Sequence, residues 1–287
     1  MKVLLAYDGS ESADQTLLDL QQAGLPRDTQ VYVLSVVEHW LPPPSALEVV
    51  EHLDYDQEFQ ALAERGAKRL RELEPGWQVE AKTKAGATAA TIIETGEEWL
   101  ADLIVLGSHG RSALGRAFFG SVSQKVLHAA HSPVRIARAR LREPGTPLRL
   151  IVGVDGSTGA AHAVAAIAKR EWSSGAEVRV LNAAWKVPPA LPNHAMGPVT
   201  QWIINENAHI KAAVEDAVEQ LTTAGLKVEV VIKEEEPKKL LCNEAEAWDA
   251  DCIFVGAHGM NRIERFLIGS VSSSVAARAH CSVEVWR

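Results

Sequence analysis

The chain has 287 residues and a formal net charge of −8, with 47% of its residues hydrophobic and 23% charged. This composition is ordinary for globular domains that bury sizeable cores, and the negative charge argues against nucleic acid or an anionic membrane as the main partner. The first apolar run stops at Asp8, so no signal peptide is expected. No run approaches the roughly 18 apolar residues that a membrane span needs.

Cysteine usage predicts the redox compartment. The three cysteines, Cys242, Cys252 and Cys281, stand without CxxC spacing. This pattern favours buried free thiols over a disulfide or a metal site. Together with the absence of a leader, it predicts a cytoplasmic protein.

Strands and helices alternate along the first half of the chain. Short apolar and β-branched runs predict strands over residues 1–7, 30–37, 78–84, 103–106 and 134–137. The stretches between them predict helices over residues 10–23, 47–73, 88–100 and 121–130. Such alternation predicts a parallel sheet with helices on both faces.

The second half repeats the plan of the first. Asp8-Gly9-Ser10 recurs as Asp155-Gly156-Ser157, and a β-branched run at residues 31–37 recurs at residues 178–184. The expected fold class is therefore α/β, with two tandem open parallel five-stranded sheets flanked by helices. The expected domains cover residues 1–140 and 148–287, with a polar linker that begins at Arg138.

One glycine-rich stretch occurs twice, first at residues 102–123. An apolar run ends at Gly107, two residues separate it from Gly110, and nine more precede Gly120-Ser121. We expect a strand, a turn and the start of a helix at these points. The second copy, at residues 251–272, places the same pattern at Gly256, Gly259, Gly269 and Ser270. Glycine permits close approach of the backbone, and the first turn of a helix leaves N–H groups unpaired, so each copy predicts a phosphate cradle built mostly from main chain.

The repeated acidic turn is expected beside this cradle. Ligands of open parallel sheets bind beyond the carboxyl ends of the strands, where the strand order reverses. If the first and fourth strands are neighbours, Asp8 lies at the same crevice as Gly107, where it can hold Mg²⁺ through water or accept hydrogen bonds from ribose hydroxyls. Capping of the helix that starts at Ser10 is the plainer alternative. Val36, at the end of the second strand, could line a base pocket. The equivalent residues of the second half are Asp155, Gly256, Ser157 and Ala183.

Both halves resemble the universal stress protein family, within the wider group of adenine-nucleotide-binding α/β domains. The resemblance rests on the Asp-Gly-Ser turn and the Gly-x2-Gly-x9-Gly-Ser pattern in each half, and it covers nearly the whole chain. It implies that ATP, or ADP or AMP, binds with Mg²⁺, with Asp8 and Asp155 at ribose or metal and Val36 and Ala183 at adenine. The other residues that it implies at the nucleotide are Ala6, Gly107, Gly110, Gly120, Ser121, Val122, Gly153, Gly256, Gly259, Gly269, Ser270 and Val271.

The second half departs from the family in one place. Members often have Gly-x-Pro before the third helix, whereas this chain has Gly86-Ala87-Thr88 in its first half and Glu235-Glu236-Pro237 in its second. With Glu234, three carboxylates would oppose a polyphosphate unless they point outward or bind metal. The second site is therefore the weaker candidate.

The expected function is a nucleotide-dependent regulatory or stress-response role rather than catalysis. Residues 115–121 have the glycine spacing of a Walker A loop but lack its lysine, and no nucleophile or carboxylate is recognisable as a partner of His109 or His258. Slow ATP hydrolysis and an interaction scaffold with vestigial nucleotide sites are the alternatives.

The fifth strands, at residues 134–137 and 283–286, are expected to be sheet edges that need cover. The resemblance implies that they pair to form a pseudo-dimer within one chain. Two chains could associate further as a homodimer, and the sequence identifies no protein partner.

Overall fold

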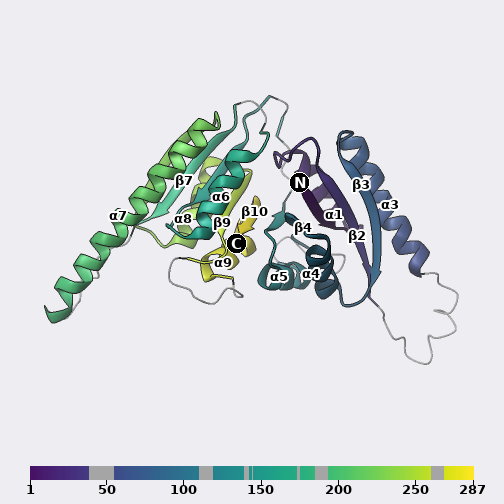
Figure 1. Ribbon diagram of the computed structural model, residues 1–287, viewed down its shortest axis with the longest axis horizontal. Helices are drawn as coiled ribbons and strands as arrows, with labels where there is room; N and C mark the ends of the chain where they lie inside the picture. The colour runs from purple at the N-terminus through teal and green to yellow at the C-terminus, as the bar shows by residue number, and fades with distance from the viewer. Residues whose placement is uncertain are drawn as a thin grey trace. The chain divides into compact units, whose positions relative to one another are not determined.

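The computed structural model consists of two compact units, Met1–Leu141 (unit 1) and Arg142–Arg287 (unit 2). Both are α/β units, as expected (Figure 1). The residues that the structure describes are 1–38, 55–109, 119–138, 142–143, 145–172, 175–184, 193–259 and 268–287.

Unit 1 contains a five-stranded parallel arrangement. Its strands are β1 (Lys2–Ala6), β2 (Gln30–Val37), β3 (Gln78–Ala85), β4 (Leu103–Gly107) and β5 (Val134–Ala137), in the order β3-β2-β1-β4-β5. Each neighbouring pair is parallel. The chain winds outward from β1 in one direction and from β4 in the other, so the strand order reverses between these two strands, as predicted.

Helices cover both faces of the unit 1 sheet (Figure 1). They are α1 (Glu11–Gln21), α3 (Tyr55–Leu73), α4 (Thr88–Trp99) and α5 (Ser121–Ala129). The helices α1 and α3 bury Leu17, Leu20 and Leu70 against Val3 and Leu5 of β1. The expected start of α3 at residue 47 lies outside the described residues.

Unit 2 repeats this architecture. Its strands are β6 (Arg149–Gly153), β7 (Glu177–Ala183), β8 (Lys227–Lys233), β9 (Cys252–Gly256) and β10 (Ser282–Trp286), in the order β10-β9-β6-β7-β8. Each neighbouring pair within the unit is parallel. Its helices are α6 (Thr158–Lys169), α7 (Asn193–Thr223), α8 (Pro237–Trp248) and α9 (Ser270–Arg278).

The long helix α7 buries one stripe of its surface. Ile210, Val214, Ala217 and Leu221 recur every three or four residues and pack into the unit 2 core. The helix continues toward its N-terminus beyond this stripe, where Trp202 is 43% exposed. Ile203, one further heptad toward the N-terminus, is also buried. Ile210 lines the cavity described below.

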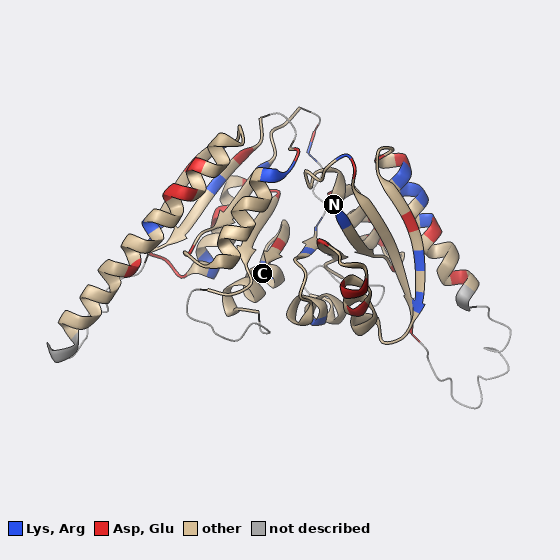
Figure 2. Ribbon diagram, viewed as in Figure 1, with Lys and Arg blue, Asp and Glu red and all other residues tan. Residues whose placement is uncertain are grey.

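Each unit has a buried ion pair that joins its last strand to its first helix or the residue after it. The strand supplies the cation in unit 1 and the anion in unit 2. In unit 1, the guanidinium of Arg135 on β5 donates to Asp19 of α1 through Nε at 2.7 Å and Nη2 at 3.0 Å. In unit 2 the strand supplies the anion, because Arg170, after α6, donates to Glu284 of β10 through Nη1 at 3.0 Å. Unit 2 also buries Asp251, which accepts a hydrogen bond from Arg142 Nε at 2.6 Å. Charges of both signs lie along α3 (Figure 2).

Candidate functional site

The carboxyl ends of β6 and β9 lie at one edge of the unit 2 sheet. The two strands are parallel neighbours, with Ile151 opposite Ile253. Asp155 follows β6 by two residues, and Gly256 ends β9. The loops that begin at these residues therefore border the crevice where a ligand of an open parallel sheet would lie.

Gly256 and Gly107 permit a helix start to pack closely against a strand end. A Cβ atom on Gly256 would lie 2.7 Å from the amide nitrogen of Ala160 and 3.1 Å from Cα of Gly159, at the start of α6. A Cβ atom on Gly107 would lie 2.6 Å from Oγ of Ser12 in α1. No L side chain fits at either position without displacing backbone or a packed hydroxyl. These two glycines therefore have a packing role in addition to the role that the sequence suggested, which is to let a ligand approach the backbone.

The helix α9 begins without a side-chain cap, in contrast to α6. The hydroxyl of Ser157 accepts a hydrogen bond from the amide of Ala160 at 3.2 Å and so caps α6. Gly269 is the N-cap of α9 and has no side chain to do the same, while Ser272 Oγ donates back to the carbonyl of Gly256 at 2.5 Å. The first turn of α9 contains no acidic residue. Its amide groups and the positive end of its dipole therefore form an anion-binding terminus.

The carboxylate of Asp155 stabilises its own turn with one oxygen and faces the crevice with the other. Its Oδ1 accepts a hydrogen bond from the amide of Ser157 at 3.0 Å. Its Oδ2 lies 3.2 Å from the position that a Cβ atom on Gly259 would take. Ser157, not Asp155, is the N-cap of α6, so capping does not account for the carboxylate. The second oxygen is placed to meet a group in the crevice.

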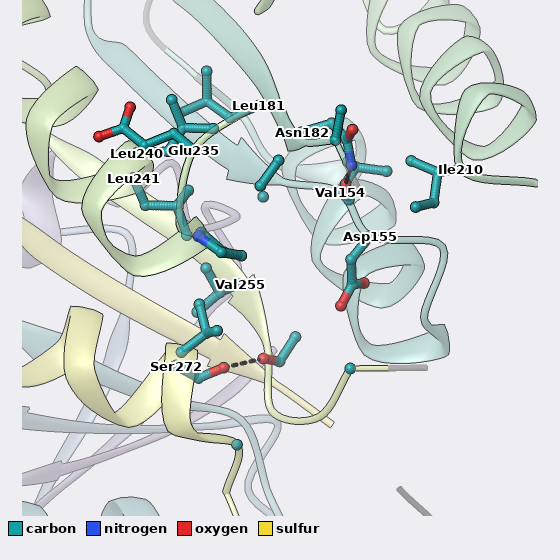
Figure 3. Close-up of a pocket in the computed structure, with 18 of the residues that line it drawn as sticks. Val154, Asp155, Leu181, Asn182, Ile210, Glu235, Leu240, Leu241, Val255 and Ser272 are labelled. Atoms are coloured by element: carbon teal, nitrogen blue, oxygen red, sulfur yellow. Dashed lines mark hydrogen bonds between the residues drawn. The ribbon is translucent and has the colours of Figure 1, made fainter. Parts of the chain in front are cut away.

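These elements enclose a cavity of about 470 Å³ (Figure 3). This volume lies within the range typical of small-molecule sites, about 300–1,000 Å³. Every binding residue that the sequence indicated in the second half lines it: Gly153, Asp155, Ala183, Gly256, Gly259, Gly269, Ser270 and Val271.

The other lining residues are mostly apolar, and among them the sequence pointed only to Glu235 and Pro237, in the turn before α8. They are Val154, Leu181, Asn182, Ala184, Ile210, Glu235, Pro237, Leu240, Leu241, Val255 and Ser272. Leu240 and Leu241 come from α8, and Ile210 comes from α7. A planar apolar group such as a nucleobase suits this part of the wall.

Asn182 is a polar residue of the site that a pattern in the sequence could have indicated. Its side chain is buried at the end of β7, and Nδ2 donates to the carbonyl oxygen of Val154 at 2.8 Å. The equivalent residue of unit 1, Ser35, donates through Oγ to the carbonyl of Tyr7 at 2.7 Å. A polar residue at the same place in two apolar strands is the pattern that could have indicated this tether.

The negative charge of the acidic turn before α8 is partly compensated by neighbouring side chains. Glu236 forms ion pairs with Lys238 at 2.7 Å and Lys239 at 3.6 Å, and the hydrogen bond from Lys238 is the main cause that lowers the pKa of Glu236. Glu235 accepts a hydrogen bond from Asn243 Nδ2 at 3.1 Å. It lies across the cavity from Asp155 (Figure 3).

Unit 1 has the same backbone arrangement at its predicted site. The amide of Ser10 donates to Asp8 Oδ1 at 3.0 Å, and Ser123 Oγ donates to the carbonyl of Gly107 at 2.8 Å. Gly120 is the N-cap of α5 and makes no side-chain cap bond. Of the remaining predicted residues, Ala6 ends β1, Val36 lies in β2, Ser121 and Val122 open α5, and Gly110 lies outside the described residues.

A tyrosine distinguishes unit 1 from unit 2. Tyr7 occupies the position equivalent to Val154, and its hydroxyl donates to the carboxylate of Asp14. Arg65 of α3 donates through Nη2 to this hydroxyl at 3.3 Å and to the carbonyl of Gly9 at 3.2 Å. Burial, and next the hydrogen bond to Asp14, raises the pKa of Tyr7. The position that is apolar in unit 2 is thus occupied by a hydrogen-bonded tyrosine in unit 1.

The two loop histidines have buried ring nitrogens. His109 Nδ1 shares a hydrogen bond of 2.7 Å with Ser108 Oγ. The Nε2 atoms of His109 and His258 are buried and have no hydrogen-bond partner among the described residues. Burial, with a smaller effect of the charge on Arg138, lowers the pKa of His109. Both causes disfavour the protonated ring of His109 relative to the neutral ring.

The described residues contain no cluster of three or more His, Cys, Asp or Glu side chains that could hold a metal ion. All three cysteines are free thiols, with Cys252 and Cys281 buried and Cys242 half-buried. Among the helices of the described segments, none combines the length and the apolar composition that a bilayer crossing requires.

The fold and the site define a class of protein. The chain is a tandem α/β protein in which the first and fourth strands of each unit are neighbours, and in unit 2 a cavity lies at their carboxyl ends. The chain belongs to the universal stress protein family, whose model matches residues 1–138 and 148–287.

This chain is similar to other universal stress proteins. A universal stress protein of Mycobacterium tuberculosis (strain H37Rv) is 26% identical, over 99% of this chain and 96% of that protein. One from Methanocaldococcus jannaschii is 28% identical over 148 residues, which cover 50% of this chain and 84% of that protein. Among solved structures, a universal stress protein from Archaeoglobus fulgidus matches all of this chain and 96% of its own with a TM-score of 0.65 at 22% identity, a likeness of fold.

Proposed function

We propose that the chain is an adenine-nucleotide-binding regulatory protein and that the unit 2 cavity is a nucleotide site. The observation that carries the proposal is the convergence of eight residues, chosen from the sequence for a nucleotide, on the wall of one cavity. Membership of the universal stress protein family supports a role in the response to stress.

The cavity offers each part of a nucleotide a matching surface. The phosphates would lie at the uncapped start of α9, where Gly269, Ser270 and Val271 present main-chain amides. The ribose would lie within reach of Asp155, whose carboxylate can accept from hydroxyl groups. The base would lie against Ala183 and the leucines of α8.

The residues present also fit a magnesium ion that arrives with the nucleotide. Mg²⁺ keeps several waters and is commonly held through one or two carboxylates together with phosphate oxygens. Asp155 in unit 2 and Asp8 in unit 1 supply one carboxylate each. Their contribution would be to hold a water-bound ion next to the phosphates.

The same proposal extends to unit 1. Asp8, Gly107 and Gly120 repeat the backbone hydrogen bonds of their counterparts, and α5 has the same uncapped start as α9. The hydrogen-bonded Tyr7 makes the two units different at this position, so the two sites are expected to differ in affinity.

A stability measurement tests the proposal. Ligand that binds only the folded chain at a hundred times its Kd adds about 2.7 kcal/mol to the free energy of unfolding. We therefore expect millimolar adenine nucleotide with Mg²⁺ to raise the melting temperature. In Gly259→Val the new side chain would point at Asp155 Oδ2, the one described atom within 4 Å of its Cβ, and would fill the ribose position.

The matched control is Gly197→Val on α7, where an added Cβ meets no described atom within 4 Å. We expect the control to keep the nucleotide-induced shift and Gly259→Val to lose the part due to unit 2. Absence of any shift in the unaltered chain would refute the proposal. A turnover assay on the same samples separates a binding role from slow ATP hydrolysis.

A further inference from the structure

The strand β8 forms an edge of the unit 2 sheet and exposes apolar side chains. It is the last strand in the order β10-β9-β6-β7-β8 and pairs with β7. Val230 is 42% exposed and Ile232 is 54% exposed. An edge strand is a template for pairing with another chain, and apolar side chains on it favour such pairing. The edge of β8 is therefore a candidate interaction surface.

Val230 and Ile232 lie on the face of the sheet that α7 covers (Figure 1). Alternate residues of a strand share a face, and Val228 packs against the core that contains Ile210 and Val214 of α7. The helix thus covers the first part of β8 on this face and leaves the last part accessible. A partner strand at this edge would bury Val230 and Ile232 beside α7.

Unit 1 protects the equivalent edge strand, β3. The pairings of β3 with β2 and of β8 with β7 place Ala81, Lys82 and Thr83 at the positions of Val230, Val231 and Ile232. Thr83 Oγ1 donates to Gln60 of α3 at 2.8 Å, and Lys82 adds a charge to the strand. Lysine on an edge strand disfavours pairing with another chain. Unit 2 has valine and isoleucine at these positions, so this protection is missing there.

The backbone of β8 restricts how a second strand can pair with it. The amide of Lys227 donates to the carbonyl of Ala176, and the carbonyl of Lys233 accepts from the amide of Ala184. Both partners flank β7, so the odd-numbered residues of β8 turn their main chain toward β7. Main-chain groups alternate in direction along a strand, so the even-numbered residues turn theirs toward the open edge. An antiparallel partner must therefore form hydrogen-bonded pairs with the even-numbered residues.

A second copy of β8 satisfies this restriction. If Val231 lies opposite Val231 of the second copy, then Val230 lies opposite Ile232 in a hydrogen-bonded pair, and Glu229 lies opposite Lys233. Apolar residues then meet apolar residues, and each carboxylate meets an ammonium group, which stabilises an antiparallel pair. Twofold symmetry repeats every one of these contacts.

The neighbouring registers bring like charges together. A shift of two residues is the smallest that keeps even-numbered residues paired with one another. In one direction it places Lys227 opposite Lys233, and in the other it places Glu229 opposite Glu235. Like charges directly opposite one another destabilise a strand pair. The charge pattern of β8 therefore favours the register centred on Val231.

The charges at this edge already have partners within unit 2. Glu229 pairs with Arg179 at 2.7 Å, and Lys233 pairs with Glu244. Across the twofold axis, Glu229 of one copy and Lys233 of the other would join these pairs into a row of alternating sign. Each charge keeps its present partner and gains another of opposite sign.

We propose that two copies of this chain associate through β8, which pairs with itself in antiparallel fashion about a twofold axis at Val231. The axis is perpendicular to the sheet, so the two α7 helices lie on the same face. Val230 and Ile232 of both copies are enclosed between these helices. This surface is separate from the unit 2 cavity, and the association does not depend on nucleotide binding.

Analytical ultracentrifugation of the full chain tests the association, and we expect a concentration-dependent dimer. Val231→Lys places two lysines opposite one another at the axis and should raise the dimer dissociation constant about tenfold. The equivalent residue of unit 1 is Lys82, so the variant should fold. Ala90→Lys is the matched control, because it adds the same charge at an exposed residue of α4. It should leave the dissociation constant unchanged.

A charge exchange tests the pairing of Glu229 with Lys233. Glu229→Lys and Lys233→Glu should each weaken the dimer, because each places like charges opposite one another. The double variant restores opposite charges and should recover the association. Effects within one chain cannot produce this recovery, because the exchange leaves Arg179 beside a lysine and Glu244 beside a glutamate.

Disulfide crosslinking tests the register in a Cys242→Ser background, in which the two remaining cysteines are buried. Val231→Cys places two thiols in a pair that is not hydrogen-bonded, with Cα atoms about 4.5 Å apart, which suits a disulfide. Glu229→Cys is the matched control on the same face of the strand. Its symmetry mate lies four residues further along, about 14 Å away, so it should not crosslink.

The outcomes distinguish the association from its details. A chain that stays monomeric at every concentration it reaches in solution would overturn the proposal. A dimer that tolerates Val231→Lys as well as Ala90→Lys would show that another surface is used. Equal crosslinking of Val231→Cys and Glu229→Cys would contradict the register. None of these results bears on the nucleotide site, which the ligand-induced change in melting temperature tests separately.

Discussion

Asn182 tethers the turn that carries Asp155, and its replacement tests how the site is held. The side chain is 5% exposed, and its Nδ2 donates to the carbonyl oxygen of Val154 at 2.8 Å. In Asn182→Ala this buried oxygen loses its donor, and an unsatisfied buried group costs about 1–3 kcal/mol. Asn182→Asp should cost more, because a carboxylate oxygen would then face the carbonyl oxygen in a poorly hydrated place.

Urea unfolding, fitted with a separate transition for each unit, measures these changes in the free energy of unfolding. Ser35→Ala is the matched variant of unit 1, since Ser35 Oγ makes the equivalent bond to Tyr7 at 2.7 Å. Its effect should fall on the unit 1 transition, and that of Asn182→Ala on unit 2. Equal stability of the alanine and aspartate variants at position 182 would refute the reasoning, which depends on a donor facing the Val154 oxygen.

Three further predictions concern a buried ion pair, a helix cap and a buried imidazole. Asp19→Asn removes the anion that faces the buried guanidinium of Arg135, and unit 1 should lose about 3–5 kcal/mol in urea unfolding. Ser157→Ala removes the side-chain acceptor at the start of α6 and should cost unit 2 about 0.5–2 kcal/mol by the same measurement. Burial, and next the charge of Arg138, lowers the pKa of His109, so the folded state binds this proton less readily than the unfolded chain. Stability should then decline as the pH falls from about 6.5 toward the lowered pKa, and His109→Asn should flatten that part of the profile.

Exposed residues of the same types supply the controls. Asp28→Asn, Thr158→Ala and His209→Asn change side chains at the surface, and each should alter the free energy of unfolding by less than about 0.5 kcal/mol. The ion-pair argument is wrong if Asp19→Asn behaves like Asp28→Asn. The cap argument fails if Ser157→Ala matches Thr158→Ala, and the pH argument fails if both histidine variants give one profile.

The backbone of the site could be predicted because few residue types can build it. Glycine at the end of β9 and at the N-cap of α9, with serine next to it, predicted where the strand ends and where the helix begins. The same pattern predicted β4 and α5. Helix α1 begins at Glu11, one residue later than expected, because Ser10 is its N-cap. Local requirements of this kind are visible in the sequence.

The side-chain wall could not be predicted, because it depends on what the core leaves unfilled. Helical periodicity places Ile210 on the buried face of α7, yet it does not show that this residue borders a cavity while Val214 packs into the core. Leu240 and Leu241 look like any buried pair at the start of a helix. Their place in the wall follows from how α8 and α7 approach the sheet, which is a long-range property of the fold.

The acidic turn before α8 shows that the electrostatic effect of a charged residue cannot be predicted without the structure. The sequence placed Glu234, Glu235 and Glu236 near the second crevice, and repulsion of a polyphosphate was expected from them. Pairing of Glu236 with lysines and the bond from Asn243 to Glu235 reduce that contribution.

The two units share their main-chain elements and differ in the side chains around them. Each has an Asp-Gly-Ser turn, a tethered carbonyl before it and an uncapped helix start. At the wall, Tyr7 in unit 1 is bound by Asp14 and Arg65, whereas Val154 in unit 2 presents methyl groups to a cavity. At the proposed sites, the main-chain amides that both units share would accept any phosphate-bearing group, so they would not distinguish one nucleotide from another. Any difference in ligand preference between the two proposed sites would then come from residues in which the units differ, such as Tyr7 and Val154.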